Sequence, residues 1–270
     1  MSAYRFCRTD DIPLLVDAWN RCGLPHDPTA APLTVAGFKQ EIRELDLWCS
    51  SCMVGFEADE PVAVVIGCKR PPDTLVRRIA VHPDHLRKGH GRHLLTSLSA
   101  KLSILGPPRL VAEVPADNAQ ARALFEACGW EHDRTYYDLV LDGESAGVPS
   151  GAITVVTPDD LPDAVPSDDS QSAWQCARAT VEKRRERIQG LALVSADRLE
   201  AGVLYTREAE EVAIWAVQTS GDGAPLSAIV RDVERRESKP AVLHGWPDRS
   251  LSAFRAIREA LRFVTAAKPA

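Results

Sequence analysis

The spacing of apolar residues in the first half of the chain switches repeatedly between that of a helix and that of a strand. Apolar positions three and four apart predict helices between a cap at Asp10 or Asp11 and Gly23, and over residues 33–45, 91–105 and 119–128. Strand-like runs cover residues 4–8, 51–58, 61–69, 74–81, 109–114 and 135–141. Residues 62–66 are all apolar, so we expect their strand to be covered on both faces of its sheet. This alternation predicts an α/β domain built on a mixed sheet.

The second half repeats much of this order in a shorter form. Strands are expected at residues 191–195, 201–206, 212–217 and 241–244, with a polar turn at Asp197 and Arg198. Helical spacing of four apolar residues predicts a helix that contains Leu226, Ile229, Val230 and Val233. A second helix is expected over residues 252–261, followed by Phe263.

Two stretches without apolar periodicity separate these patterns. Residues 143–150 combine Gly, Ser and Pro and are typical of a linker, and residues 157–172 are rich in Asp, Pro and Ser. At 270 residues the chain is long for one domain and comfortable for two. We therefore expect two domains, residues 1–145 and residues 151–270.

Composition narrows the function classes. The net charge of −6 gives no basic footprint, so nucleic acid is not an expected partner. No run of 18 apolar residues and no signal-like N-terminus occur, so neither membrane insertion nor export is expected. Seven cysteines without a framework spacing favour reduced thiols and a cytoplasmic location.

Candidate chemistry concentrates in the loop that follows the strand at residues 74–81. Gly89 and Gly91, one residue apart, precede an amphipathic helix. Glycines let backbone N–H groups approach a ligand, and a helix N-terminus attracts anions. Arg87, Lys88 and Arg92 add positive charge. The pattern fits a pyrophosphate site, and the alternative is a glycine-containing turn with a solvated basic face.

The flanking residues point to a known family. The strand ends in Val81-His82-Pro83, and Gly89 and Gly91 follow eight and ten residues after Val81. The segment resembles the acyl-CoA-binding motif of the GNAT superfamily of N-acyltransferases, Gln/Arg-X-X-Gly-X-Gly/Ala after a strand that ends in Val-X-Pro. Leu86 stands where the family usually has Gln or Arg, so the neighbouring Arg87 and Lys88 are expected to supply the charge.

A second segment resembles the same family at the expected distance. Residues 118–130 are similar to its Asn-X-X-Ala-X-X-Leu-Tyr-X-X-X-Gly-Phe sequence, with Phe125 in place of the usual Tyr. Asn118 can also cap a helix, and Phe125 can also pack in a core. The resemblance implies acetyl-CoA as co-substrate, bound by Ile79, Ala80, Val81, Arg87, Lys88, Gly89, His90, Gly91, Arg92, Asn118 and Phe125.

The resemblance also implies direct attack of an acceptor amine on the thioester. A backbone N–H near Ala80 or Val81 would stabilise the oxyanion. Glu113 is our candidate base, its alternative role is a salt bridge with Arg77, Arg78 or Arg109, and Asp73 is the alternative base. Tyr137, or its neighbour Tyr136, is the candidate acid that replaces the missing Tyr, unless both are packing partners.

The second half departs from the motif where the cofactor would bind. Val217 and Gly221 are four residues apart, half the spacing in the first half, and Asp222 adds a negative charge. We interpret this half as a degenerate GNAT-like domain without an intact pyrophosphate loop. The fold expected for the whole chain is a tandem of GNAT-like domains, each a mostly antiparallel sheet flanked by helices.

Two patterns of metal-ligating residues are weighed against this reading. His82, His85, His90 and His93 lie within twelve residues, but on the loop expected to hold the pyrophosphate. Cys49 and Cys52 form a single Cys-X-X-Cys without a second pair, which favours buried thiols. No metal is therefore expected.

The sequence thus predicts an acetyl-CoA-dependent N-acetyltransferase with a small-molecule or protein amine as acceptor. The alternative is a non-catalytic acyl-CoA-binding or scaffold protein of the same fold. The oligomeric state stays open, with a homodimer as one option.

Overall fold

The computed structural model describes residues 2–143, 151–165, 171–196, 198–219 and 223–269. The chain divides into two compact units. The first unit comprises Met1–Arg134 together with Leu261–Ala270, and the second comprises Thr135–Ala260. The expected division at residues 145 and 151 therefore differs from these units at both ends of the second half, and residues 144–150 of the expected linker lie outside the described residues.

The helices and strands of the first unit follow the predicted order. Its helices are α1 (Ile12–Cys22), α2 (Val35–Leu45), α3 (His90–Leu105) and α4 (Ala119–Ala127), with short 3-10 turns at Thr9–Asp11, Leu24–His26, Cys49–Ser51 and Pro83–His85. Its strands are β1 (Ala3–Phe6), β2 (Met53–Glu57), β3 (Glu60–Arg70), β4 (Asp73–Val81) and β5 (Arg109–Pro115), joined by the last part of β12.

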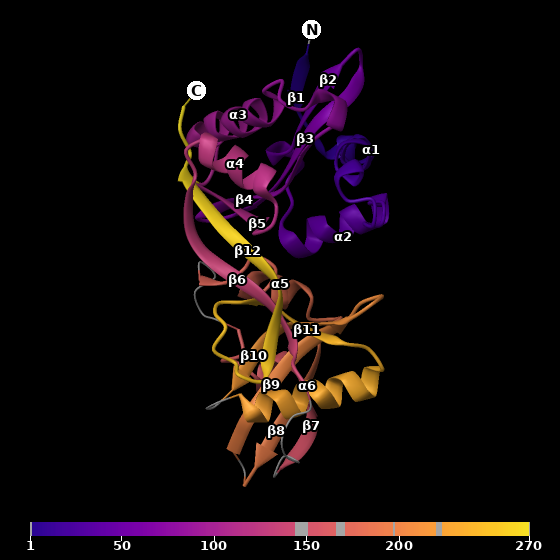
Figure 1. Ribbon diagram of the computed structural model, residues 1–270, viewed down its shortest axis with the longest axis vertical. Helices are drawn as coiled ribbons and strands as arrows, with labels where there is room; N and C mark the ends of the chain where they lie inside the picture. Colours follow the sequence, from indigo (N-terminus) through magenta and orange to yellow (C-terminus); the bar gives the residue numbers. More distant parts are fainter. Residues whose placement is uncertain (1, 144–150, 166–170, 197, 220–222, 270) are drawn as a thin grey trace. The chain divides into compact units, whose positions relative to one another are not determined.

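The sheet of the first unit runs in the order β1-β2-β3-β4-β5-β12. Neighbours from β1 to β4 are antiparallel, whereas β4 and β5 are parallel, because helix α3 carries the chain back between them. Helices α3 and α4 cover one face, and α1 and α2 lie on the other (Figure 1). Strand β3 is buried along most of its length, as its continuous apolar run predicts.

Alternate residues of β3 serve the two faces. Ala63 and Val65 pack with Leu94, Leu98 and Phe125 of α3 and α4. Their neighbours on the strand are equally buried and point to the opposite face, as the two-residue period of a strand requires. This arrangement fixes α3, and with it the loop at its N-terminus, against the sheet.

The last strand of the chain completes the first unit. Strand β12 spans Phe254–Ala266, and its residues from Leu261 onward belong to the first unit. Phe263 is fully buried and stacks on Phe125 with ring centroids 6.0 Å apart. Arg262 is buried as well and reaches Asp73, with 3.4 Å between Nη2 and Oδ2.

The second unit has the same arrangement of strands. Its elements are the larger part of β6 (Glu131–Leu141), β7 (Ala152–Val156), α5 (Arg178–Lys183), β8 (Gln189–Ser195), β9 (Arg198–Arg207), β10 (Val212–Thr219), α6 (Ala224–Glu237), β11 (Ala241–Trp246) and the first part of β12, with a 3-10 turn at Pro158–Asp160. Strands β7 to β10 are antiparallel neighbours, and β10 and β11 are parallel on either side of α6. The pair β10 and β11 thus corresponds to β4 and β5, and the predicted fold of two GNAT-like halves is confirmed.

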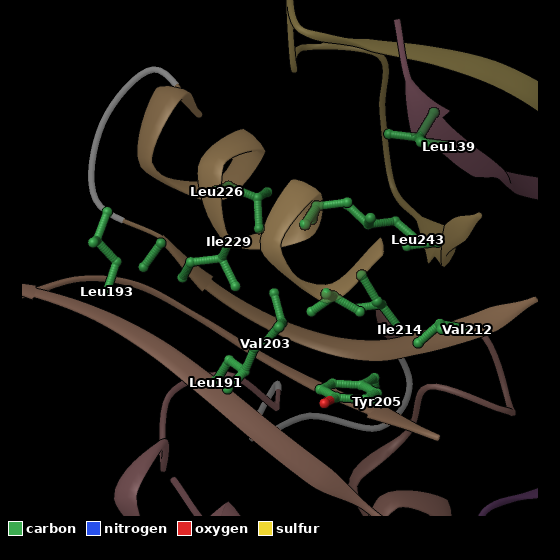
Figure 2. Close-up of a cluster of buried hydrophobic side chains, with 14 of the residues drawn as sticks. Leu139, Leu191, Leu193, Val203, Tyr205, Val212, Ile214, Leu226, Ile229 and Leu243 are labelled. Carbon is green, nitrogen blue, oxygen red and sulfur yellow. The ribbon is translucent and has the colours of Figure 1, made fainter. Parts of the chain in front are cut away.

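Helix α6 supplies the core of the second unit. Leu226 and Ile229 point from α6 toward the sheet, where Val203 and Ile214 meet them (Figure 2). The four apolar residues that predicted this helix are all buried. The apolar residues that recur with the helical period therefore form the face of α6 that packs on the sheet.

The prediction of a helix over residues 252–261 is wrong. The segment forms strand β12, whose neighbours in the sheets are β5 and β6. Ala, Arg, Glu and Leu dominate its sequence and favour helix locally, but pairing with distant strands outweighs that preference. Strand β7 and helix α5 were not predicted, since their apolar stretches are short.

Candidate functional site

Strands β4 and β5 pair over only part of their length. Strand β4 pairs with β3 up to Val81, whereas its pairing with β5 ends at Val76 and Ala112 in the described register. Beyond this point the β5-facing edge of β4 is released from the ladder. Backbone N–H and C=O groups there are available to an extended ligand. Ile79, Ala80 and Val81, predicted to contact the cofactor, lie on this released stretch.

A β-bulge marks the point of separation. The pairing of β3 with β4 steps from Gly67–Val76 to Ile66–Arg78 and leaves out Arg77. Bulges bend a strand and raise its twist, so β4 turns away where its pairing with β5 ends. Burial lowers the pKa of Arg77, and its Nε has no hydrogen-bond partner among the described residues.

Glu113 lies at the same opening, on the opposite strand. It directly follows Ala112, the last residue of β5 that pairs with β4, and it is half-buried. Its negative charge raises the pKa of Arg77 and so partly opposes the effect of burial. Glu113, the predicted base, therefore lies at the point where β4 and β5 separate. Its electrostatic interaction with Arg77 agrees with the alternative role, the pairing with an arginine.

Asp73, the alternative base, is engaged elsewhere. It is buried and forms ion pairs with Arg109 and Arg262. It lies at the start of β4, at the opposite end of the β4–β5 pairing from the point where the strands separate. Among the two predicted carboxylates, Glu113 is the better placed for proton transfer.

The glycine loop leads into an uncapped helix N-terminus. Gly89 has a φ of +87° and precedes His90, the first residue of α3, and no described side chain caps this end. Arg87 also has a positive φ of 63°. His93 is the donor of the hydrogen bond to the Gly89 carbonyl, so the preceding N–H groups of the first turn lack helical acceptors. This end of α3 is suited to an anion.

Gly91 serves packing as well. A Cβ at this position would lie 3.0 Å from Cδ2 of Leu124, so glycine eases the close packing of α3 on α4. Around the loop, Arg87, Lys88 and Arg92 are exposed. The site therefore combines free backbone donors with positive charge that a ligand can reach, and it fits a pyrophosphate.

Asn118 and Phe125, predicted to contact the cofactor, both have structural roles at α4. The Asn118 side chain accepts a hydrogen bond from the Ala121 N–H at 2.9 Å and caps α4, as its alternative role predicted. Asn118 is exposed, so its N–H₂ group can still meet a ligand. Phe125 is only 2% exposed and packs between Trp130 and Phe263, which leaves no ring surface for a cofactor.

The two tyrosines considered as acids belong to the second unit. Tyr137 is half-buried beneath the Arg249 guanidinium, 4.5 Å from its ring centroid. Tyr136 is buried in a separate core cluster. The predicted catalytic pair, Glu113 and Tyr137, is thus distributed over both compact units, and Tyr136 is a packing residue.

Histidines of the loop gather around a residue that the sequence did not indicate. Glu57, at the end of β2, lies 3.2 Å from Nδ1 of His85 and 3.3 Å from Nε2 of His90. His93 instead packs against Tyr4 with the two rings tilted and their centroids 3.9 Å apart. His90, expected to bind cofactor, points its ring inward and is 3% exposed. Only the spacing of the histidines was visible in the sequence, because Glu57 comes from a distant strand.

The Cys-X-X-Cys segment holds buried thiols, as expected. Cys49 and Cys52 are both buried, and burial raises the pKa of the Cys52 thiol. All seven cysteines lie in the described ranges and are free.

In the second unit, Gly223 precedes α6 with a φ of +84°, as Gly89 precedes α3. Gly221 and Asp222 of the shortened loop lie outside the described residues. A half-buried histidine, His244, lies between Asp138 and Glu211. Sequence reasoning missed this group, since its members come from three separate segments.

Taken together, a parallel strand pair that opens at a bulge and a glycine loop at a helix N-terminus define a fold of the GNAT type. Residues 15–130 match the sequence model of the acetyltransferase (GNAT) family. Residues 15–130 accordingly form a domain of this family, and the chain as a whole has the fold of two GNAT-like halves.

Sequence relatives match part of this domain. Over 71 residues the chain is 42% identical to the ribosomal protein bS18-alanine N-acetyltransferases of Salmonella typhimurium and Escherichia coli. The match covers 25% of this chain and 48% of the relatives, so the chain spans about half the length of the curated relatives it matches.

Solved structures match the fold of the whole chain. A tandem GNAT protein from the clavulanic acid biosynthesis pathway aligns over 100% of both chains, with a TM-score of 0.70 at 15% identity. A GCN5-related N-acetyltransferase from Sphaerobacter thermophilus aligns over 99% of this chain and 96% of its own, with a TM-score of 0.65 at 15% identity. None of the described helices has the length and apolar character needed to cross a membrane.

Proposed function

We propose that the protein is an acetyl-CoA-dependent N-acetyltransferase whose first unit carries the reaction. The observation that carries the proposal is the opening between β4 and β5, which leads to an uncapped helix N-terminus on the glycine loop. The family of the first half and the activity in the relatives' names support it.

The residues around the opening fit the co-substrate. The N–H groups of Gly89, His90 and Gly91, with Arg87, Lys88 and Arg92 around them, would hold the pyrophosphate. The released edge of β4 at Ile79, Ala80 and Val81 would hydrogen-bond the pantetheine arm, and Asn118 would meet it from α4. When bound, acetyl-CoA supplies an activated acyl thioester.

The chain's own groups then have two tasks. The first is to remove a proton from the acceptor amine, since a lysine-type amine has a pKa of about 10.4 and is protonated near neutral pH. We assign this to Glu113, directly or through one water. The second is to polarise the acyl carbonyl, which a backbone N–H of Ala80 or Val81 can do.

Phe125 cannot act as an acid, because it has no ionisable group and is buried. A thiol pKa of about 8.5 makes the departing thiolate tolerable without a proton donor. We therefore assign no side chain as proton donor, and Tyr137, the candidate named from the sequence, belongs to the second unit. The acceptor is proposed to be a primary amine of a small molecule or a protein.

A matched pair of variants at Gly89 tests cofactor binding. Asn and Asp both tolerate a positive φ and have nearly the same size, so Gly89→Asn and Gly89→Asp differ mainly in charge. We expect acetyl-CoA to bind the native protein saturably in calorimetry. Gly89→Asp should bind it at least about tenfold more weakly than Gly89→Asn, because a repulsion of about 1.4 kcal/mol between the Asp carboxylate and the pyrophosphate is enough for a tenfold loss. Absence of binding by the native protein would refute the proposal.

Catalysis is tested separately from binding. The buried Phe125 in place of a tyrosine favours, as second candidate, a protein that binds acyl-CoA without turnover. An assay for free thiol over a panel of amines distinguishes the two, because only an enzyme releases coenzyme A in an amine-dependent manner.

A further inference from the structure

Three side chains from separate elements converge beside the glycine loop. Glu57 ends β2, His85 ends the short helix Pro83–His85, and His90 begins α3. One ligand atom from each, a carboxylate oxygen and two ring nitrogens, lies within 4.8 Å of the others. Two imidazoles and one carboxylate are a ligand set that zinc uses in proteins.

The ring nitrogens that face Glu57 are buried without hydrogen bonds. Nδ1 of His85 and Nε2 of His90 lie 3.2 Å and 3.3 Å from its oxygens, yet neither makes a hydrogen bond within the described part of the chain. His90 is 97% buried, from an exposure of 3%. A buried polar atom without a hydrogen-bond partner lowers the stability of the fold. A ligand that bonds to both nitrogens would remove this cost.

These separations fit a metal better than a direct contact. Zinc bonds of about 2.0–2.1 Å at tetrahedral angles hold neighbouring ligand atoms about 3.3–3.4 Å apart. A charge-assisted hydrogen bond between imidazole and carboxylate would be shorter, about 2.7–2.9 Å. The 3.2 Å contact of His85 runs to Oε2 of Glu57 and the 3.3 Å contact of His90 to Oε1, and both are longer than such a hydrogen bond and close to the spacing of zinc ligands.

Outer partners hold the ligands in place. The Tyr4 hydroxyl lies 2.6 Å from Nδ1 of His90, so this nitrogen can carry the proton and leave a lone pair on Nε2. The Ser2 hydroxyl donates to Oε1 of Glu57 at 2.9 Å. Histidine ligands of metals almost always have such a partner on the other nitrogen.

We propose that Glu57, His85 and His90 bind a divalent zinc-class metal ion, with a fourth position open to water. The sequence alone predicts no metal here, because the histidines lie on the loop expected to hold the pyrophosphate and Glu57 is distant in the chain. His85 and His90 flank Leu86, Arg87, Lys88 and Gly89, so the ion would fix both ends of the loop against β2.

Cobalt(II), a spectroscopic substitute for zinc, provides the test. The untagged full-length protein is dialysed against chelator and titrated with cobalt, then with zinc as competitor. We expect about one cobalt per chain with the visible absorption of a tetrahedral nitrogen–oxygen site, displaced by zinc. Native protein that binds neither ion, or binds cobalt only with octahedral absorption, would overturn the proposal.

Variants locate the ion. The double substitution His85→Gln and His90→Gln should weaken binding at least about 100-fold, since it leaves one ligand of three. Glu57→Gln, at a partly exposed position that tolerates an amide, should weaken it similarly and covers the case in which the double variant does not fold. Unchanged affinity in a folded variant would refute the site.

Two further variants separate this site from weak surface binding. Tyr4→Phe should weaken binding by about tenfold, because it removes the partner that orients His90. His132→Gln, at an exposed histidine outside the cluster, should leave affinity unchanged. All these measurements are made without acetyl-CoA, so their failure leaves the proposed acetyl transfer untouched.

Discussion

His244 is a half-buried histidine of the second unit that lies between two carboxylates. Burial alone would lower its pKa, but hydrogen bonds to Asp138 and Glu211 outweigh burial and raise the pKa to about 9. Its ring also stacks on Trp215, with centroids 4.7 Å apart. At neutral pH the imidazolium therefore donates to both carboxylates and compensates their charges.

This group predicts a pH-dependent stability. The folded pKa lies above the unfolded value of about 6.5, so the contribution is fully present below about pH 6.5 and is lost as pH rises through about 9. His244→Gln should lower the free energy of unfolding of the second unit by about 3 kcal/mol near pH 6. Thermal unfolding of both proteins from pH 6 to 10 measures this, and a difference that does not shrink with rising pH would contradict it.

Glu113 is the residue on which proposed catalysis depends. Glu113→Gln keeps the shape of the side chain and removes the proton acceptor, so kcat/KM for the amine should fall about 10²-fold or more, with acetyl-CoA binding unchanged. Glu126→Gln, at an exposed position on α4, is the control. If the Glu113→Gln pH profile of kcat/KM matches the native one, the amine loses its proton without this residue.

Strand β12 belongs to both units, and its residues differ sharply in burial. Phe263 is 2% exposed in the first unit, whereas Ile257 is 39% exposed in the second. Phe263→Ala should reduce the opening free energy of first-unit amides by about 3–5 kcal/mol, because it leaves a cavity beside Phe125. Ile257→Ala should leave these amides unchanged, and hydrogen exchange with mass spectrometry compares the two.

The elements of the chain also show what a sequence can predict. Helix α3 and its loop were predicted because glycine, charge and helical period follow one another locally. The bulge at Arg77 and the parting of β4 from β5 were not, since they depend on pairing with other strands. The same holds for Glu57, and for β12, whose local preference for helix is overridden.

At the level of the whole chain, two GNAT-like halves were predicted and confirmed, but the division of residues between them was not. Helical and strand periods reveal elements, whereas only packing shows that Leu261–Ala270 joins the first unit. For the candidate site, the motifs predicted the loop residues. Core packing was the alternative role given for Phe125, and the structure shows it. The motifs did not predict that Tyr137 belongs to the second unit.

This division predicts how fragments behave. A fragment of residues 1–145 lacks the strand that covers Phe125 and the Arg262 partner of Asp73, so it should be largely unfolded or aggregated. The same fragment with residues 261–270 supplied through a flexible linker should show more protected amides and a cooperative melt. Equal behaviour of both fragments would show that the segment is dispensable.

The placement of residues 261–270 in the first unit also sets an order of events during synthesis. At about 5–20 residues per second, the ribosome needs roughly 6–25 s to add the stretch between Arg134 and Leu261. Throughout this interval the nascent first half has its helices and most of its strands but not its final one. Its unpaired β5 edge and the uncovered ring of Phe125 are then the surfaces that a chaperone would recognise, and they disappear only when the last strand emerges.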